Sequence, residues 1–196
     1  MTEKEENPIV ELLKTLVSAG ILAIGIRSCV AEARYIPSES MLPTLEINDR
    51  LIVEKISYRF RKPERGDVVV FSPTDALKKQ DYKEAFIKRV IGIPGDVVEV
   101  KNNAVYVNDQ KLTEKYIKEP PNYEYPPTKV PPGQYLVLGD NRNNSYDSHY
   151  WGFVPLENLI GRATVLFWPP DRLGSLDHQP LYPEAEQQAK QTERVK

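Results

Sequence analysis

The stretch Ile36–Leu45 carries two serines where they could do chemistry. It contains Pro37 and Pro43, each of which fixes its own φ and pushes the preceding residue into an extended conformation. Ser38 and Ser40 lie two positions apart in this stiff turn. One hydroxyl could attack a carbonyl carbon while the other, or a backbone N–H, stabilises the oxyanion. A turn whose hydroxyls only cap a strand is the alternative.

A lysine inside an apolar run is the second candidate. The run Ala85–Ile93 contains Lys88 and Arg89 among apolar residues, and the period of two places Phe86, Lys88 and Val90 on one face of a strand. At least one cation therefore lies against an apolar surface. Burial lowers the pKa of a lysine and can make its amine a base. The alternative is an edge strand whose charge prevents aggregation.

The segment 139–152 is the densest polar stretch of the chain, and it lies between two predicted strands. The polar groups of such a stretch must either form hydrogen bonds with one another or belong to a functional site. Ser40, Asp147 and His149 could be read as a hydrolase triad. The chain, however, has no Gly-x-Ser-x-Gly and no alternation of strands and helices, and Asp147 and His149 are too close in sequence for unstrained triad geometry.

The elements that must position these residues are strands. Seventeen prolines against ten glycines, and short apolar runs between turns, predict a mostly β fold. The segment Glu119–Pro132 holds six prolines, so we expect an irregular loop there. The predicted strands, including a hairpin closed by Asn102-Asn103, are Arg50–Ile56, Asp67–Phe71, Ala85–Ile93, Val97–Val100, Ala104–Val107, Gln134–Leu138 and Ala163–Trp168.

An apolar run at residues 12–31 is close to the roughly 20 residues that cross a bilayer. Lys14 and Arg27 lie near its ends, where long side chains reach the headgroups. We therefore expect one transmembrane anchor. A cleaved secretory signal and a buried helix are the alternatives, and the acidic leader and the long run argue against cleavage. The positive charges on the two sides nearly balance, so they do not set an orientation.

Composition restricts the function classes. A chain of 196 residues with 40% hydrophobic content can bury one main core. Its net charge is −2 and its lysines and arginines are scattered among acids, so the sequence predicts no basic surface for nucleic acid. With one cysteine, Cys29, and two histidines, no disulfide or metal cluster is expected, and Cys29 is interpreted as an inert apolar residue. Catalysis would use hydroxyls, carboxylates or amines, without cofactor or metal. We expect a polar segment at 1–11, the anchor at 12–31, a catalytic body at 32–170 and a polar tail at 171–196.

Three segments, 38–44, 88–96 and 139–148, together resemble the type I signal peptidases, and they occur in the family's order. The resemblance runs from the anchor to Trp168. It implies an antiparallel β catalytic body with a small inserted hairpin region at about 97–132. It also implies that Ser40 is the nucleophile, that Lys88 is the general base, and that the Ser38 hydroxyl and the Ser40 N–H form the oxyanion hole.

The same resemblance implies a supporting network and a substrate class. Ser145 would hydrogen-bond the lysine amine, and the rest of the network would comprise Asp140, Arg142 and Asp147. The substrates would be preproteins cut after small residues at −1 and −3, in pockets lined by Ile36, Met41, Leu45, Phe86 and Ile87. Two departures stand out: Asn143 replaces an aspartate of many members, and His149 replaces an arginine, which leaves the partner of Asp147 undefined.

The expected partners are the signal peptides of exported preproteins, and membrane lipid around the N-terminal helix, with no nucleic acid. We expect a single-pass protein of a bacterial-type cell membrane or a thylakoid membrane, with its catalytic body on the trans side. A tethered module that binds partners through its proline-rich loop is the alternative, but it would have no use for Lys88. The self-cleaving Ser/Lys repressors would need a helix-turn-helix where this chain has its apolar run.

Overall fold

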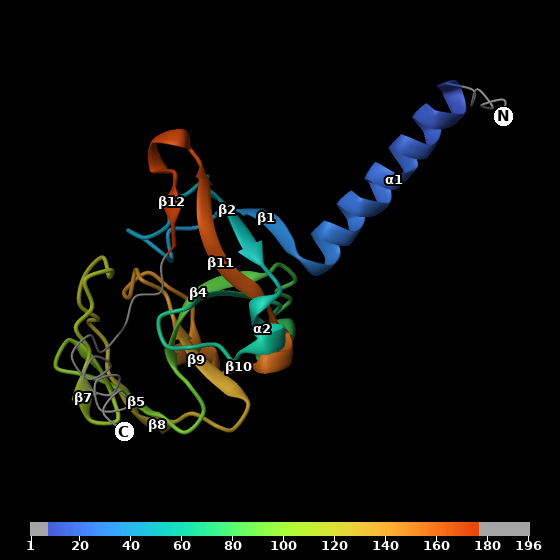
Figure 1. Ribbon diagram of the computed structural model, residues 1–196. Helices are drawn as coiled ribbons and strands as arrows, with labels where there is room; N and C mark the ends of the chain where they lie inside the picture. Colours follow the sequence, from blue (N-terminus) through green and yellow to red (C-terminus); the bar gives the residue numbers. More distant parts are fainter. Residues whose placement is uncertain (1–7, 177–196) are drawn as a thin grey trace, which may run out of the picture.

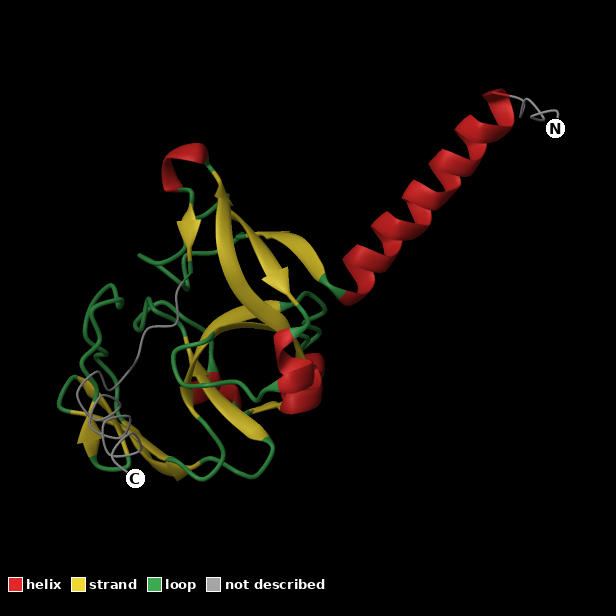
Figure 2. Ribbon diagram, viewed as in Figure 1, coloured by secondary structure: helices red, strands yellow, loops and turns green. Residues whose placement is uncertain are grey.

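The computed structural model describes residues 8–176, and it has a mostly antiparallel β body with one long helix (Figure 1; Figure 2). The predicted fold class is therefore confirmed. The helices are α1 Pro8–Cys29, α2 Ser57–Phe60, α3 Asp75–Lys78, α4 Ser148–Trp151, η1 Leu156–Asn158 and η2 Pro170–Arg172. The strands are β1 Ala31–Tyr35, β2 Arg50–Glu54, β3 Val68–Phe71, β4 Phe86–Gly92, β5 Val97–Lys101, β6 Ala104–Val107, β7 Gln110–Lys111, β8 Tyr125–Lys129, β9 Gln134–Leu138, β10 Val154–Pro155, β11 Leu159–Trp168 and β12 Gly174–Ser175.

The larger sheet carries the strand with the two cations. Its order is β1-β2-β11-β3-β4-β9-β10, with β12 paired to β11. Strand β4 lies between β3 and β9, and the register sets Lys88 opposite Val69 and Arg89 opposite Leu138. The edge-strand interpretation of Lys88 is therefore wrong, because this lysine sits in the interior of the sheet.

A second sheet, ordered β7-β6-β5-β8, forms the inserted region. Asn102 and Asn103 have φ of 49° and 56°, as a tight hairpin turn requires. The expectation of an irregular loop at 119–132 is wrong for its middle part, since strand β8 pairs with β5. Pro126 and Pro127 fit there because β8 is an edge strand, and because its register with β5 shifts between Tyr125 and Thr128, where these two prolines lie.

Helix α1 projects away from the body (Figure 1). Its window Pro8–Gly25 has a mean hydropathy of 1.6 and is not buried against the rest of the protein. The helix ends at Cys29, and β1 begins at Ala31 and pairs with β2 along its whole length. Residues 1–7 of the expected polar segment and 177–196 of the expected tail lie outside the described residues.

Three apolar clusters form the core. One packs beneath the turn at Ile36–Leu45, which we call the serine turn, and includes Ile36, Met41 and Leu45. A second, around Phe71 and Trp151, packs against the side chain of Phe86. The third joins the small sheet to β4 and β9. The turn and strand β4 are thus each supported by close-packed side chains, which fixes their positions relative to one another.

Candidate active site

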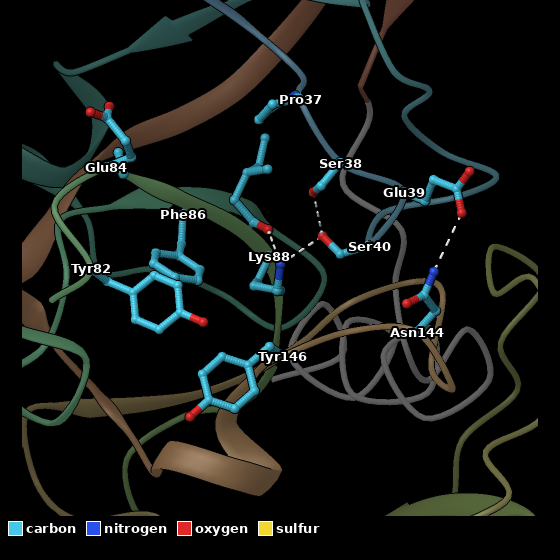
Figure 3. A pocket seen from close by; sticks show the side chains of 12 residues that line it. Pro37, Ser38, Glu39, Ser40, Tyr82, Glu84, Phe86, Lys88, Asn144 and Tyr146 are labelled. Carbon is cyan, nitrogen blue, oxygen red and sulfur yellow. Dashed lines mark hydrogen bonds between the residues drawn. The ribbon is translucent and has the colours of Figure 1, made fainter. Parts of the chain in front are cut away.

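Strand β4 brings the amine of Lys88 to the serine turn. The Lys88 Nζ lies 2.7 Å from the Ser40 Oγ, and it donates a hydrogen bond to the Ile87 carbonyl at 2.9 Å (Figure 3). The Ser38 Oγ is 3.3 Å from the Ser40 Oγ. A lysine and a serine 48 positions apart in the chain are therefore within proton-transfer distance of one another.

The Lys88 side chain has little contact with solvent, since the residue is 3% exposed. Burial disfavours the ammonium form and lowers the pKa of Lys88 to about 8, although the carboxylates of Asp147 and Asp140 oppose this shift. A large share of the protein therefore carries an uncharged amine at mildly alkaline pH. Such an amine has a lone pair that can accept the Ser40 proton.

A buried ion pair ties the three segments of the site together. The Arg89 guanidinium binds Asp140 through two hydrogen bonds, of 2.8 and 2.7 Å. Thr44, in the serine turn, donates to the same carboxylate at 2.5 Å. Strand β4, the serine turn and the polar loop 139–148 are thus held by one carboxylate. We did not predict this pairing of Asp140, although a second cation in a buried strand signals that a carboxylate must lie nearby.

Gly139 allows the polar loop to approach the serine turn closely. A Cβ at this position would lie 2.4 Å from the Ser40 carbonyl oxygen and 2.2 Å from the Ser145 Oγ, and both distances are too short for a side chain. The Asn141 N–H donates to the same Ser40 carbonyl at 3.1 Å. The polar loop therefore rests on the backbone of the residue that carries the candidate nucleophile.

Asp147 and Arg142 have separate partners. Asp147 accepts a hydrogen bond from the Gly139 N–H at 2.9 Å, and its other oxygen lies 2.7 Å from the His149 Nδ1. Arg142 forms a two-bond ion pair with Glu114, at 2.7 Å for each bond. His149 is therefore the partner of Asp147 that the sequence left undefined, and Glu114 is a member of the network that we did not predict.

Ser145 and Asn143 lie in the same polar loop as these groups. The Ser145 Oγ is buried and has no hydrogen-bond partner among residues 8–176, so the structure does not join it to Lys88. Asn143 accepts a hydrogen bond from the Asn122 N–H and donates one to the Pro120 carbonyl. It thereby links the polar loop to the chain that leads into β8.

A cavity of about 350 Å³ opens beside Ser40 and Lys88. Of the five residues that the resemblance implies for the substrate pockets, Phe86 and Ile87 line this cavity, whereas Ile36, Met41 and Leu45 lie in the core beneath the turn. The lining side chains that we did not predict are Pro37, Glu39, Tyr82, Glu84, Ala85, Asn144 and Tyr146. Several of these come from the α3–β4 connection, where the sequence shows only a polar loop.

Comparison with known proteins identifies the class to which this fold and site belong. Residues 9–168 match the family described as signal peptidase, peptidase S26. That match covers most of the chain, and the chain therefore belongs to the signal peptidase family. It is a serine peptidase of the signal peptidase I type.

Individual relatives agree. The chain is 69% identical over 171 residues to a probable signal peptidase I-2 of Synechocystis sp., a match covering 87% of this chain and 78% of the relative. It is 61% identical over 181 residues to a signal peptidase I of Leptolyngbya laminosa, covering 91% and 89% respectively. A probable thylakoidal processing peptidase 2, chloroplastic, of Arabidopsis thaliana is 45% identical over 167 residues, covering 84% of this chain and 46% of the relative.

Proposed function

We propose that this signal peptidase removes signal peptides from exported preproteins with Ser40 as nucleophile and Lys88 as general base. The observation that carries the assignment is the 2.7 Å contact between the Ser40 Oγ and the buried Lys88 Nζ. A lysine whose pKa is lowered to about 8 supplies the base that a serine hydroxyl needs. The neighbouring cavity gives a peptide access to both groups.

The proposed reaction proceeds in two halves. The neutral Lys88 amine takes the Ser40 proton as Oγ bonds to the carbonyl carbon, and the oxyanion accepts hydrogen bonds from the Ser40 N–H and the Ser38 hydroxyl. The resulting ammonium gives its proton to the leaving amine, and the peptide bond breaks. Water then attacks the acyl carbon while Lys88 accepts its proton, the bond between that carbon and the Ser40 Oγ breaks, and Lys88 returns the proton to Oγ.

In this proposal Asp140, Asp147 and Arg142 do not contact the substrate; they hold the backbone of the polar loop against Ser40. Asp140 would hold Arg89 and Thr44, and Asp147 would hold the Gly139 N–H, so that the polar loop keeps Ser40 in place. Arg142 would brace the loop through Glu114. We propose that Ser145, whose hydroxyl is unpartnered among residues 8–176, turns toward the lysine amine when substrate excludes water.

The cut would follow small residues at −1 and −3. Phe86 and Ile87 provide apolar walls of the cavity that receives them. Ile36, Met41 and Leu45 would shape the site from below, because they pack under the turn that carries Ser38 and Ser40.

The protein would be anchored in a membrane by α1. Its length and its lack of packing against the body support a single membrane crossing. Relatives include bacterial and chloroplast thylakoid enzymes, which supports either a bacterial cell membrane or a thylakoid membrane. The catalytic body would lie on the trans side, where signal peptides emerge after translocation.

A single-turnover assay on a synthetic peptide with an Ala-x-Ala cleavage site tests the function. The intact protein should release both fragments, whereas Ser40→Ala and Lys88→Ala should reduce cleavage to the uncatalysed rate. His149→Ala is the control, because this residue touches neither reacting atom and its loss should largely spare cleavage. Cleavage by Lys88→Ala at the unmodified rate, or loss in the His149 variant alone, would contradict the assignment.

A further inference from the structure

Three aromatic rings form one side of the catalytic cavity, and we refer to Tyr82, Phe86 and Tyr146 as the aromatic wall. They come from the α3–β4 connection, from β4 and from the polar loop, and all three line the cavity. The Tyr82 and Tyr146 rings are stacked with centroids 5.8 Å apart, and Tyr82 meets Phe86 edge-on at 5.4 Å. Figure 3 shows these rings on one side of Lys88 and the serines on the other.

The wall is held in place at both ends. The Tyr146 hydroxyl donates a hydrogen bond to the Gln80 Oε1 at 2.8 Å, which joins the polar loop to the α3–β4 connection. At the other end, Phe86 stacks on Phe71 at 5.8 Å and packs against Trp151. The rings therefore need little further ordering when a ligand binds.

The wall still presents apolar surface to an incoming chain. Tyr82 is 42% exposed although its ring lies among other aromatic rings, and Tyr146 is only partly buried. A cavity of about 350 Å³ is much larger than the two methyl groups of an Ala-x-Ala sequence. A peptide whose scissile carbonyl reaches Ser40 would leave the wall uncovered unless a larger side chain filled the space.

We propose that Tyr82 and Tyr146 are specificity-determining residues that bind an aromatic side chain of the preprotein close to the scissile bond. This inference rests on the proposed function and adds a substrate preference beyond the small residues at −1 and −3. An aromatic ring is favoured over an aliphatic chain, because edge-to-face and offset-stacked ring pairs gain roughly twofold to tenfold in affinity beyond the area that they bury.

The experiment uses the full-length protein in detergent and peptides with a fixed Ala-x-Ala core. One residue at a time, at −4, −2, +1 and +2, is set to Phe, Leu or Ser. At one of these positions Phe should raise kcat/KM over Ser by about threefold to tenfold, mainly through KM, and Leu should raise it less. Equal rates for the Phe and Ser peptides at all four positions would overturn the inference while leaving the proposed function intact. Failure to cut the Ser peptides would instead count against the function.

Variants separate binding to the wall from a structural effect. Tyr82→Ala and Tyr146→Ala should each bring the ratio of kcat/KM for the Phe peptide to kcat/KM for the Ser peptide close to one, mainly through KM, while the pH midpoint of cleavage stays the same. Tyr146→Phe keeps the ring and loses only the bond to Gln80, so it should retain the preference. Tyr106→Ala, in the small sheet and outside the cavity, is the control and should behave as the unmodified protein does. A Phe preference that survives in both alanine variants would contradict the assignment.

Discussion

At the scale of single residues, the proposed chemistry depends on the burial of Lys88. Exposed lysines have a pKa near 10.4 and are almost fully charged at pH 7. Burial of Lys88 against the serine turn lowers its pKa to about 8, so that about a tenth of the amine is neutral at pH 7 and half at pH 8. In the proposed mechanism, this neutral amine is the base that accepts the proton of the Ser40 hydroxyl, which it contacts.

The pH dependence of cleavage follows from the sign of this shift. In the proposed mechanism the active form is the deprotonated amine, so kcat/KM should rise with pH, reach half its maximum near pH 8 and level off above it. Between pH 6 and pH 7 the rate should increase about tenfold, as for a single ionisation. Initial rates on the Ala-x-Ala peptide across pH 5.5–10 would measure this profile. A flat profile over that range would exclude an amine base.

Gly139 offers a second test at this scale. Gly139→Ala places a methyl group against the Ser40 carbonyl and the Ser145 side chain, which must move the polar loop or the nucleophile. Because a misplacement of about 1 Å can reduce catalysis about 100-fold, we expect a loss of that order in kcat. Gly174→Ala, whose Cβ would have no neighbour closer than 3.8 Å, should keep full activity. Full activity in the Gly139 variant would show that the close approach is not needed.

At the scale of elements, the site is a junction of a strand, a turn and a loop. Asp140 in the loop binds Arg89 in β4 and Thr44 in the turn, and the side chains of the ion pair are at most 2% exposed. A buried ion pair is weak evidence for added stability, but removing one partner leaves an uncompensated charge. This carboxylate is therefore one of the contacts that hold the strand, the turn and the loop in register.

Asp140→Asn tests this junction. The change leaves the Arg89 guanidinium buried without its counter-charge, so it should lower the free energy of unfolding by about 3–5 kcal/mol. Urea denaturation followed by tryptophan fluorescence would measure the loss. Asp75→Asn removes an exposed ion pair with Lys78 and should change stability by less than about 0.5 kcal/mol. Equal stability of the two variants would contradict the role of Asp140.

At the scale of the whole molecule, the helix and the catalytic body are largely separate. Helix α1 is exposed at every position where its burial is described, and its end is joined to the body by a hydrogen bond from the Lys55 Nζ to the Arg27 carbonyl. The strand that follows, β1, is part of the large sheet. Folding of the β body therefore does not depend on burial of α1 against it.

Removal of residues 1–29 should detach the protein from lipid without affecting catalysis. Because α1 does not line the cavity, the shortened chain should cleave the soluble Ala-x-Ala peptide within about twofold of the full chain. In flotation with phospholipid vesicles, the full chain should rise with lipid and the shortened chain should remain below. Protease protection of the full chain in sealed vesicles would report the side on which the body lies. Flotation of the shortened chain as well would contradict an anchor role for α1 alone.

The sequence predicts most strands because alternating apolar residues and turn residues act locally. The runs Asp67–Phe71, Ala85–Ile93 and Val97–Val100 correspond to β3, β4 and β5 within one or two residues at either end. Strand β8 was missed because proline disfavours strands in general, and only its edge position together with the register shift against β5 makes Pro126 and Pro127 acceptable. The pairing of Arg142 with Glu114 was missed for a similar reason, since nothing local joins two residues 28 positions apart.

The sequence by itself determined which reactive groups the chain possesses, their order and their family, because residue types and short motifs carry that information directly. Only the tertiary structure decided which groups meet. Ser40 reaches Lys88 across 48 residues, Arg89 reaches Asp140 across 51, and the aromatic wall joins Tyr82 to Tyr146. These contacts follow from strand order and register, which are set by burial of the whole apolar core rather than by any single segment.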